Sequence, residues 1–143
     1  MGSYSAASTL QQPVRLHGIA LGRPTDMLLD PDLRQVVGFV VNCSDEAVRF
    51  LPYGAAEPGE AEIAVQSALM LLEDIAFYRE RGVSFRSLLD GEVERGGRPV
   101  GVLCDIVVGQ GGAVEELELR RGGTRRRVPA PGSTVIPTRA SAA

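Results

Sequence analysis

The sequence is poor in the residues that most catalytic and metal sites need. His17 is the only histidine, and the two cysteines, Cys43 and Cys104, stand far apart. A serine–histidine or cysteine–histidine catalytic pair would have to use His17, which sits beside Gly18 in a turn, and the cysteines lack metal-ligand spacing. No phosphate-binding loop and no nucleophile elbow is present. These absences favour a protein that is not an enzyme and that uses no cofactor or metal.

Long apolar runs and lysine are lacking as well. The longest uninterrupted apolar run, Ala68 to Leu72, is far shorter than the roughly 20 residues that cross a bilayer, so we expect no membrane span. No signal-peptide pattern is present, which makes the cytoplasm the expected location and free thiols more expected than a disulfide. Every cationic side chain is an arginine, yet the net charge is −3. This acidic balance argues against a dedicated nucleic-acid-binding protein.

What the sequence does contain is an internal repeat. Two glycines and an aspartate recur at a constant spacing of 79 residues: Gly18, Gly22 and Asp26, then Gly97, Gly101 and Asp105. The apolar segments that follow, Val36 to Val41 and Val114 to Leu119, also match. Each copy then runs into a further apolar stretch that ends at a proline, Pro52 or Pro129. A repeated pattern of turns and apolar positions predicts two copies of one supersecondary design.

Both copies have the pattern of β-structure. His17-Gly18 and Gly96-Gly97 occupy the centre of a tight hairpin turn, where both residues need positive φ. The next strand of the first copy, Ile19 to Leu29, contains Gly22 and Pro24, so we expect a bulge or bend there. Asp26 and its equivalent precede an apolar triplet at this bend, a position where an aspartate commonly accepts hydrogen bonds from nearby backbone.

One helical stretch separates the copies. Ser67 is a suitable N-cap, residues 68–81 contain strong helix formers, and Gly82 fits the C′ position. The apolar residues of this stretch cover more than one stripe, so the helix is expected to pack on both repeats or on a second subunit. The expected organisation is a disordered N-terminus over residues 1–12, a first repeat over 13–66, a connecting helix over 67–82, a second repeat over 83–137 and a disordered tail over 138–143.

These residues resemble the PRC-barrel domain, a small β-barrel found in the photosynthetic reaction-centre H subunit, in the ribosome maturation factor and in many stand-alone proteins. The resemblance rests on the stretch from Leu21 to Pro31, the run Val36 to Val41 and the segment Arg49 to Tyr53, and Gly101 to Val108 looks like a second copy. It implies a mostly β protein with two small PRC-barrel-like β-barrel units joined by a single α-helix. It also implies a role in protein interaction and assembly.

Two features are candidate partner-binding surfaces. The first is the apolar excess of the connecting helix, which suits another protein or a second copy of the chain in a homodimer: Met70, Phe77 and Tyr78. The second is an arginine-rich hairpin around Gly122-Gly123, whose guanidiniums suit phosphates or carboxylates: Arg120, Arg121, Arg125, Arg126 and Arg127. The same arginines could instead be neutralised by acids on the neighbouring strand: Glu115, Glu116 and Glu118.

The leading interpretation is a noncatalytic adaptor that binds another protein, whose identity the sequence does not give. The alternative is an RNA- or ribosome-associated factor that uses the arginine hairpin. The adaptor is favoured because cross-strand acids are available to the arginines and because aromatic stacking residues are missing from this hairpin.

Overall fold

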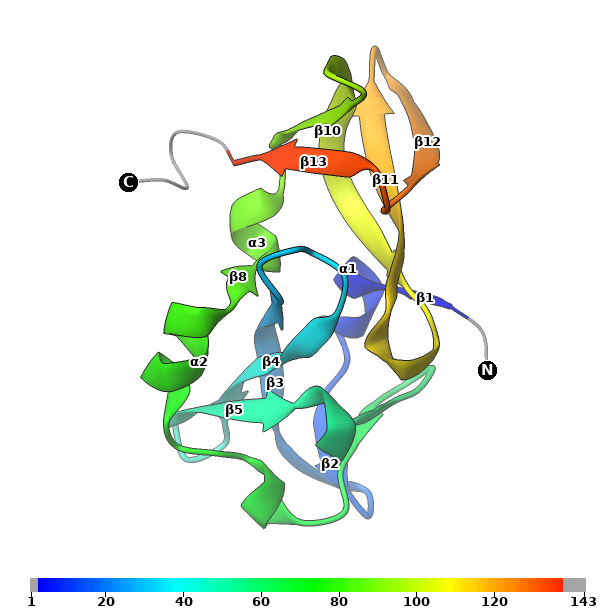
Figure 1. The fold of residues 1–143 in the computed structure, drawn as a ribbon. Coiled ribbons are helices and arrows are strands. Elements are labelled where there is room, and N and C mark those ends of the chain that lie inside the picture. Colours follow the sequence, from blue (N-terminus) through cyan, green and yellow to red (C-terminus); the bar gives the residue numbers. More distant parts are fainter. Residues whose placement is uncertain (1–2, 138–143) are drawn as a thin grey trace.

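The computed structural model describes residues 3–137, which form two β-sheets and three short helices (Figure 1). The first sheet has the order β5-β4-β3-β2-β7-β6, with β8 paired to β3. Its strands are β2 (Val14–Leu16), β3 (Ile19–Leu29), β4 (Val36–Cys43), β5 (Val48–Pro52), β6 (Glu57–Pro58), β7 (Ile63–Ala64) and β8 (Val83–Ser84). The fold is therefore mostly β, as the sequence predicts.

The second sheet has the order β12-β11-β10-β9-β13, with β1 paired to β10. Its strands are β1 (Tyr4–Ser5), β9 (Glu92–Arg95), β10 (Arg98–Val108), β11 (Val114–Arg121), β12 (Thr124–Pro129) and β13 (Ser133–Ile136). The helices are α1 (Ala6–Thr9), α2 (Ile75–Arg81) and α3 (Phe85–Leu88), and the 3₁₀ turns are η1 (Tyr53–Ala55), η2 (Ala68–Met70) and η3 (Gln110–Gly112).

The two sheets repeat the same local design. His17 and Gly18 have φ of 49° and 84°, and Gly96 and Gly97 have φ of 60° and 78°, so both hairpin turns have the predicted positive φ. The pairing of β3 with β4 slips between Pro24 and Asp26, and that of β10 with β11 slips at the equivalent place, just before Asp105. The predicted bulge is therefore present in both copies, immediately after Pro24 in the first.

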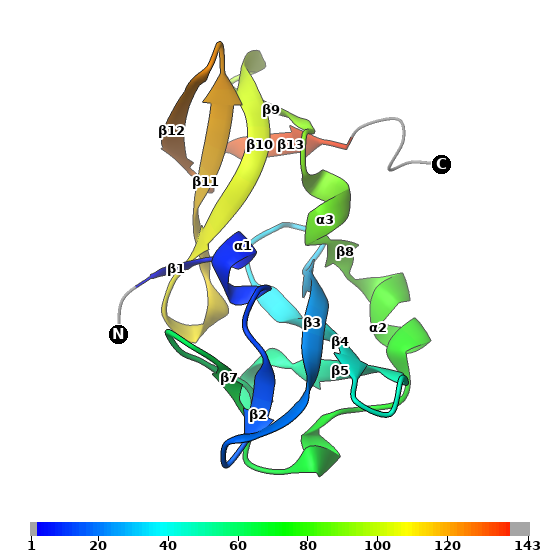
Figure 2. The same cartoon turned by 180° about the vertical axis from the view of Figure 1, so that it is seen from behind.

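Each repeat lends its first strand and helix to the other repeat. β1 pairs with the end of β10, where Tyr4 lies opposite Val108, and β8 pairs with the end of β3, where Val83 lies opposite Leu29. The members of the second pair are related to those of the first by the same 79-residue spacing. Figure 2 shows the consequence, with α1 against the second sheet and α3 against the first. The exchange is reciprocal, so neither sheet is complete without the other repeat.

Asp26 and Asp105 anchor the exchanged segments. Asp105 Oδ1 accepts a hydrogen bond from the backbone N–H of Ala7 in α1 at 3.0 Å, and Asp26 Oδ1 accepts one from Arg86 in α3 at 3.1 Å. Each carboxylate also accepts from the backbone N–H of the residue that follows it, at 2.8 Å. Ser84, the N-cap of α3, donates its hydroxyl to Asp26 as well. The repeated aspartates thus bond backbone, as predicted, and they do so partly across the two repeats.

The disorder expected for residues 1–12 is wrong for the part that the structure describes. Residues 3–12 contain β1 and α1, and Ala6, Thr9 and Leu10 are buried. These small and polar residues carry almost no hydrophobic signal of their own, so their order depends on the long strand of the other repeat, which no local pattern reveals. The tail over residues 138–143 lies outside the described residues.

A single apolar core joins the repeats. It combines buried side chains of both sheets and both exchanged helices, among them Phe39, Leu51, Leu103, Leu119, Ala6 and Phe85. At the junction of the repeats Gln35 forms a β-bridge with Ala113, its own equivalent 78 residues later. Two equivalent residues pair with each other only close to a twofold axis, so the repeats are arranged as an approximately symmetric pair.

The connecting helix is shorter than the predicted span of 67–82. Ser67 caps only the 3₁₀ turn η2, and Asp74 caps α2, which begins at Ile75. Between them Leu72 runs as extended chain and exchanges two backbone hydrogen bonds with Phe50, of 2.8 and 2.7 Å. An exposed sheet edge offers unpaired N–H and C=O groups, and pairing with that edge has replaced the helical hydrogen bonds here.

Helix α2 also does not bridge the repeats. It lies on the outer face of the first sheet, where Ile75 and Tyr78 pack against Leu28, Val40 and Phe50. The repeats meet instead through the exchanged segments and the Gln35–Ala113 bridge. Covering by α2 explains why β4 is apolar on both faces, whereas β11 alternates apolar and acidic residues, as predicted.

We expect a chain that ends at Gly82 to aggregate or to show no cooperative thermal transition. It would keep β2 to β7 but lose β8 and α3, and with them the partners of Asp26 and Leu29. Refolding it together with residues 83–143 should restore one cooperative transition, because each fragment then supplies the segment that the other lacks. Circular dichroism melts would measure this. Full-chain stability of the 1–82 fragment alone would contradict the exchange.

Candidate functional site

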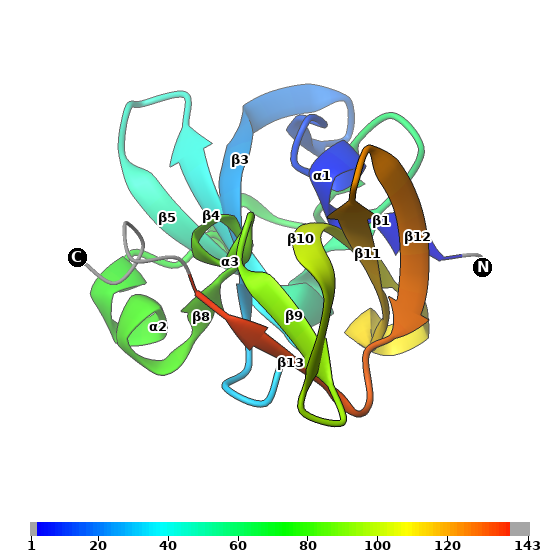
Figure 3. The same ribbon diagram turned by 90° about the horizontal axis from the view of Figure 1, so that it is seen from above.

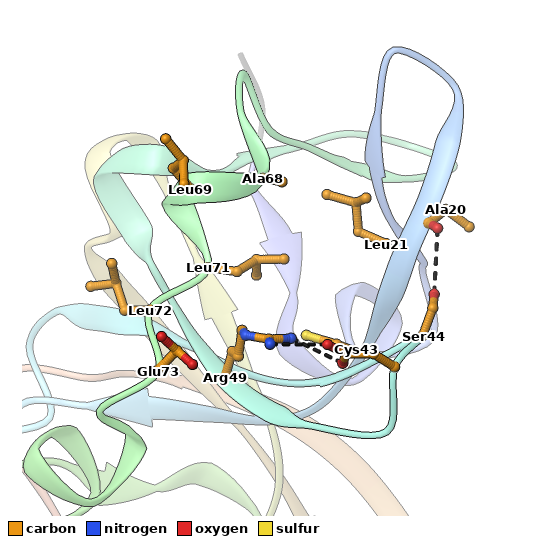
Figure 4. A pocket seen from close by; sticks show the side chains of 11 residues that line it. Ala20, Leu21, Cys43, Ser44, Arg49, Ala68, Leu69, Leu71, Leu72 and Glu73 are labelled. Carbon is orange, nitrogen blue, oxygen red and sulfur yellow. Dashed lines mark hydrogen bonds and ion pairs between the residues drawn. The ribbon is translucent and has the colours of Figure 1, made fainter.

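The largest hollow next to exposed apolar side chains lies at the free end of the first sheet (Figure 4). It has a volume of about 610 Å³. One wall is the segment from Ala68 to Glu73 that links β7 to α2, so we name the hollow the linker pocket. Its lining residues are Ala20, Leu21, Cys43, Ser44, Asp45, Arg49, Ala68, Leu69, Leu71, Leu72 and Glu73.

A fixed ion pair stands against these apolar walls. The Arg49 guanidinium donates to both carboxylate oxygens of Asp45, each at 3.0 Å. The hydrogen bond from Arg49 lowers the pKa of Asp45 and raises that of Arg49, so the pair persists to a lower pH than an isolated aspartate would allow. Ser44 donates its backbone N–H to Leu21 O at 2.9 Å and so closes the strand end beside the pocket.

Exposed apolar side chains gather around this pocket. Leu69, in η2, is 86% exposed, and its neighbour Met70 is also exposed. Ile19 and Val48, both exposed, directly precede the lining residues Ala20 and Arg49. Of the six large apolar side chains exposed in the described part of the chain, four therefore lie in or next to the segments that build the pocket. Such a grouping marks a surface that is covered by a partner.

The predicted helix residues do not form one surface. Met70 lies in η2 beside the linker pocket, whereas Phe77 and Tyr78 lie in α2. Tyr78 stacks on Phe50, with ring centroids 4.0 Å apart, and is half-buried against the first sheet. Phe77 is exposed, and the Arg81 guanidinium lies 3.6 Å from its ring centroid. Met70 and Phe77 thus remain surface candidates, while Tyr78 packs.

The pairing of Tyr78 with Phe50 predicts a difference between the two adjacent aromatic residues. Tyr78→Ala should lower the free energy of unfolding by about 2 kcal/mol, because it removes a stacked ring from a packed face. Phe77→Ala should lower it by less than about 1 kcal/mol, because that ring is exposed. Urea denaturation would measure both. Equal losses would mean that Phe77, too, belongs to the core.

The arginine hairpin lies on the second repeat, apart from α2 and the linker pocket (Figure 1). Its turn residues Gly122 and Gly123 have positive φ, as the hairpin requires. Glu118 bonds Arg125 at 3.1 Å and Arg127 at 3.4 Å. The cross-strand pairing anticipated from the sequence is therefore present for these two arginines.

The remaining charges of the hairpin are arranged differently. Arg127 also lies 3.9 Å from Glu116, but Arg120 pairs with Asp90 at 3.0 Å, a partner that the sequence did not suggest. Glu115 accepts a hydrogen bond from Ser3 instead of meeting an arginine. The other two guanidiniums donate to backbone carbonyls: Arg121 to Pro99 and Arg126 to Val100.

Removing the charge of Glu118 should expose this cationic surface. We expect Glu118→Gln to elute from heparin at higher salt than the unmodified protein, because it frees Arg125 and Arg127 from their shared carboxylate. Glu115→Gln changes the net charge equally but touches no hairpin arginine, so it should shift elution less. Equal shifts for the two variants would mean that only net charge matters.

No other side-chain cluster in the described residues suggests chemistry. His17 serves the first hairpin turn, and neither cysteine is in a disulfide. Burial raises the pKa of the Cys104 thiol, which disfavours its thiolate form. Among residues 3–137, His, Cys, Asp and Glu side chains nowhere gather in a group suited to a metal ion. Within the same residues every helix is too short or too polar to cross a membrane.

Comparison with known proteins adds no assignment. No protein-family model matches the chain, and no curated protein matches its sequence. The linker pocket itself was missed by sequence reasoning, because its wall was interpreted as part of a helix. The signal was the run from Ala68 to Leu72, which is too continuously apolar for a helix with one buried stripe.

Proposed function

We propose that the protein is a noncatalytic adaptor, built on two PRC-barrel-like β-barrel units, that binds another protein at the linker pocket. The observation that carries the proposal is the grouping of exposed apolar side chains around this pocket. Leu69 is the extreme case, because it is 86% exposed on a short turn that the chain itself leaves uncovered among the described residues.

The extent of the apolar surface favours a protein over a small molecule as the partner. A small ligand inside the pocket could contact Leu21 and Leu71 but would not cover Ile19, Val48 or Leu69, which lie exposed at or beside the lining segments. A partner that inserts an apolar side chain and spreads over the rim would cover both sets. A buried centre surrounded by a wider contact is the usual form of a protein interface.

The Arg49–Asp45 pair supplies a polar feature for specificity. It is held in a bidentate geometry before any partner binds, so little side-chain entropy is lost when a partner hydrogen-bonds to it. We therefore propose a partner segment that presents a bulky apolar side chain next to a polar group. This chemistry differs from that of RNA, whose recognition needs cationic and stacking side chains.

Leu69→Glu should abolish partner binding and leave the fold intact. The free energy of unfolding should stay within about 1 kcal/mol of the unmodified value, because Leu69 is exposed. Ile136→Glu is the matched control, since Ile136 is an exposed apolar residue of the second sheet and should retain the partner. Affinity capture with both variants would measure this. Recovery of the same partner by Leu69→Glu would contradict the proposal.

Two further readouts separate the alternatives. Nuclease treatment before capture should not affect recovery of a protein partner, whereas loss of the recovered material after nuclease would favour the RNA- or ribosome-associated alternative. Light scattering on the purified chain tests for a second copy at the same surface. A dimer that becomes monomeric in Leu69→Glu would identify the partner as another copy of this chain.

A further inference from the structure

The outer edge of the first sheet is covered by the chain itself. Strand β5 ends that sheet, and Phe50 lies in its middle. The backbone N–H of Phe50 donates to Leu72 O at 2.8 Å, and Leu72 donates back to Phe50 O at 2.7 Å. The two residues form an antiparallel bridge. The backbone groups that face outward from this edge are therefore satisfied within the chain.

The equivalent edge of the second sheet has no such cover. Strand β12 ends that sheet and, within residues 3–137, pairs only with β11. Figure 3 shows β12 on the outside of the molecule. The residue that corresponds to Phe50 is Arg127, 77 residues later, just as Pro52 corresponds to Pro129. One repeat thus covers its edge, and the other exposes it.

The ladder register shows which backbone groups are open. Arg121 and Thr124 flank the two-glycine turn and form its closing pair, and pairs along an antiparallel ladder alternate between hydrogen-bonded and non-hydrogen-bonded. Arg125 and Arg127 therefore direct their N–H and C=O groups away from β11. Pro129 ends the edge, since it has no N–H and its carbonyl accepts a hydrogen bond from Arg95.

The side chains along this edge are cationic. Arg125, Arg126 and Arg127 are consecutive and exposed, with 67% and 54% of the side chains of Arg125 and Arg127 accessible. Their main carboxylate partner, Glu118, is only 18% accessible and lies on the inner neighbour strand. A strand added to the outer edge would place its own side chains beside these guanidiniums, so acidic residues would suit it best.

We propose that the outer edge of β12 binds an extended acidic segment of a partner protein as an additional antiparallel strand. This deepens the proposed adaptor function by adding a second, chemically different contact. The chain provides its own precedent, because Leu72, which covers the equivalent edge, is followed by Glu73 and Asp74. In strand addition, main-chain hydrogen bonds supply affinity and side chains supply selectivity.

A second copy of this chain is the wrong occupant for the edge. Twofold pairing of β12 with itself would place the arginines of both copies opposite each other, and like charges directly opposite in a sheet are destabilising. Consecutive arginines at an open edge instead protect against self-association while leaving the edge available to an acidic strand.

The test uses the full chain and a capped peptide of six alternating valine and glutamate residues, the length of β12. NMR titration should move backbone amide signals of β12 and leave those of the linker pocket unchanged. A peptide with alternate amides N-methylated should bind about tenfold more weakly, because each lost backbone hydrogen bond costs roughly that factor. The valine–lysine peptide should not bind.

Two variants separate backbone pairing from charge. Arg127→Pro removes the outward N–H and should weaken binding about tenfold, whereas Arg127→Ala keeps that N–H and should weaken it only about threefold. Equal binding of the methylated and unmethylated peptides, or signal changes at the linker pocket, would overturn the proposal. Leu69→Glu should bind the peptide normally. If the peptide does not bind while partner capture still depends on Leu69, only the β12 proposal fails.

Discussion

The structure depends on two carboxylates that hold each repeat to the other. Asp26 receives backbone N–H groups from α3, and Asp105 receives one from α1, so each aspartate fixes a segment that comes from the opposite half of the chain. Those segments carry Ala6, Leu10, Phe85 and Leu88 into the shared core. A repeat of this length is close to the lower size limit for an independent core, and the exchange provides the missing apolar surface.

This symmetric frame supports two unlike surfaces. At the end of the first sheet Leu72 covers the edge, and the segment that carries it also forms the wall of the linker pocket with Leu69 exposed. At the end of the second sheet the corresponding edge is short, open and lined with arginine. Residues that set turns, bulges and the core are shared by the repeats, whereas residues at the sheet ends have diverged. The two ends therefore differ in the chemistry that they offer.

The sequence predicts the features that local rules govern. The turn glycines, the bulge after Pro24, the alternation of β11 and the pairing of Glu118 with Arg125 and Arg127 all follow from short-range pattern and strand neighbours. It does not predict the order of residues 3–12, because that order is set by contact with β10, roughly a hundred residues away. The linker pocket was missed for the same reason. The helix formers from Ala68 to Leu72 obey the edge of β5 rather than their own propensity.

The bridge between Gln35 and Ala113 has a consequence for how the halves are held together. A contact between equivalent residues is the contact of a symmetric dimer, and here both halves of that dimer belong to one chain. Association of the halves is unimolecular, so dilution cannot separate them and their stability is independent of protein concentration. Two identical subunits must change together with every substitution. Fused halves are released from that restriction, and each end of this molecule can adapt to a different neighbour.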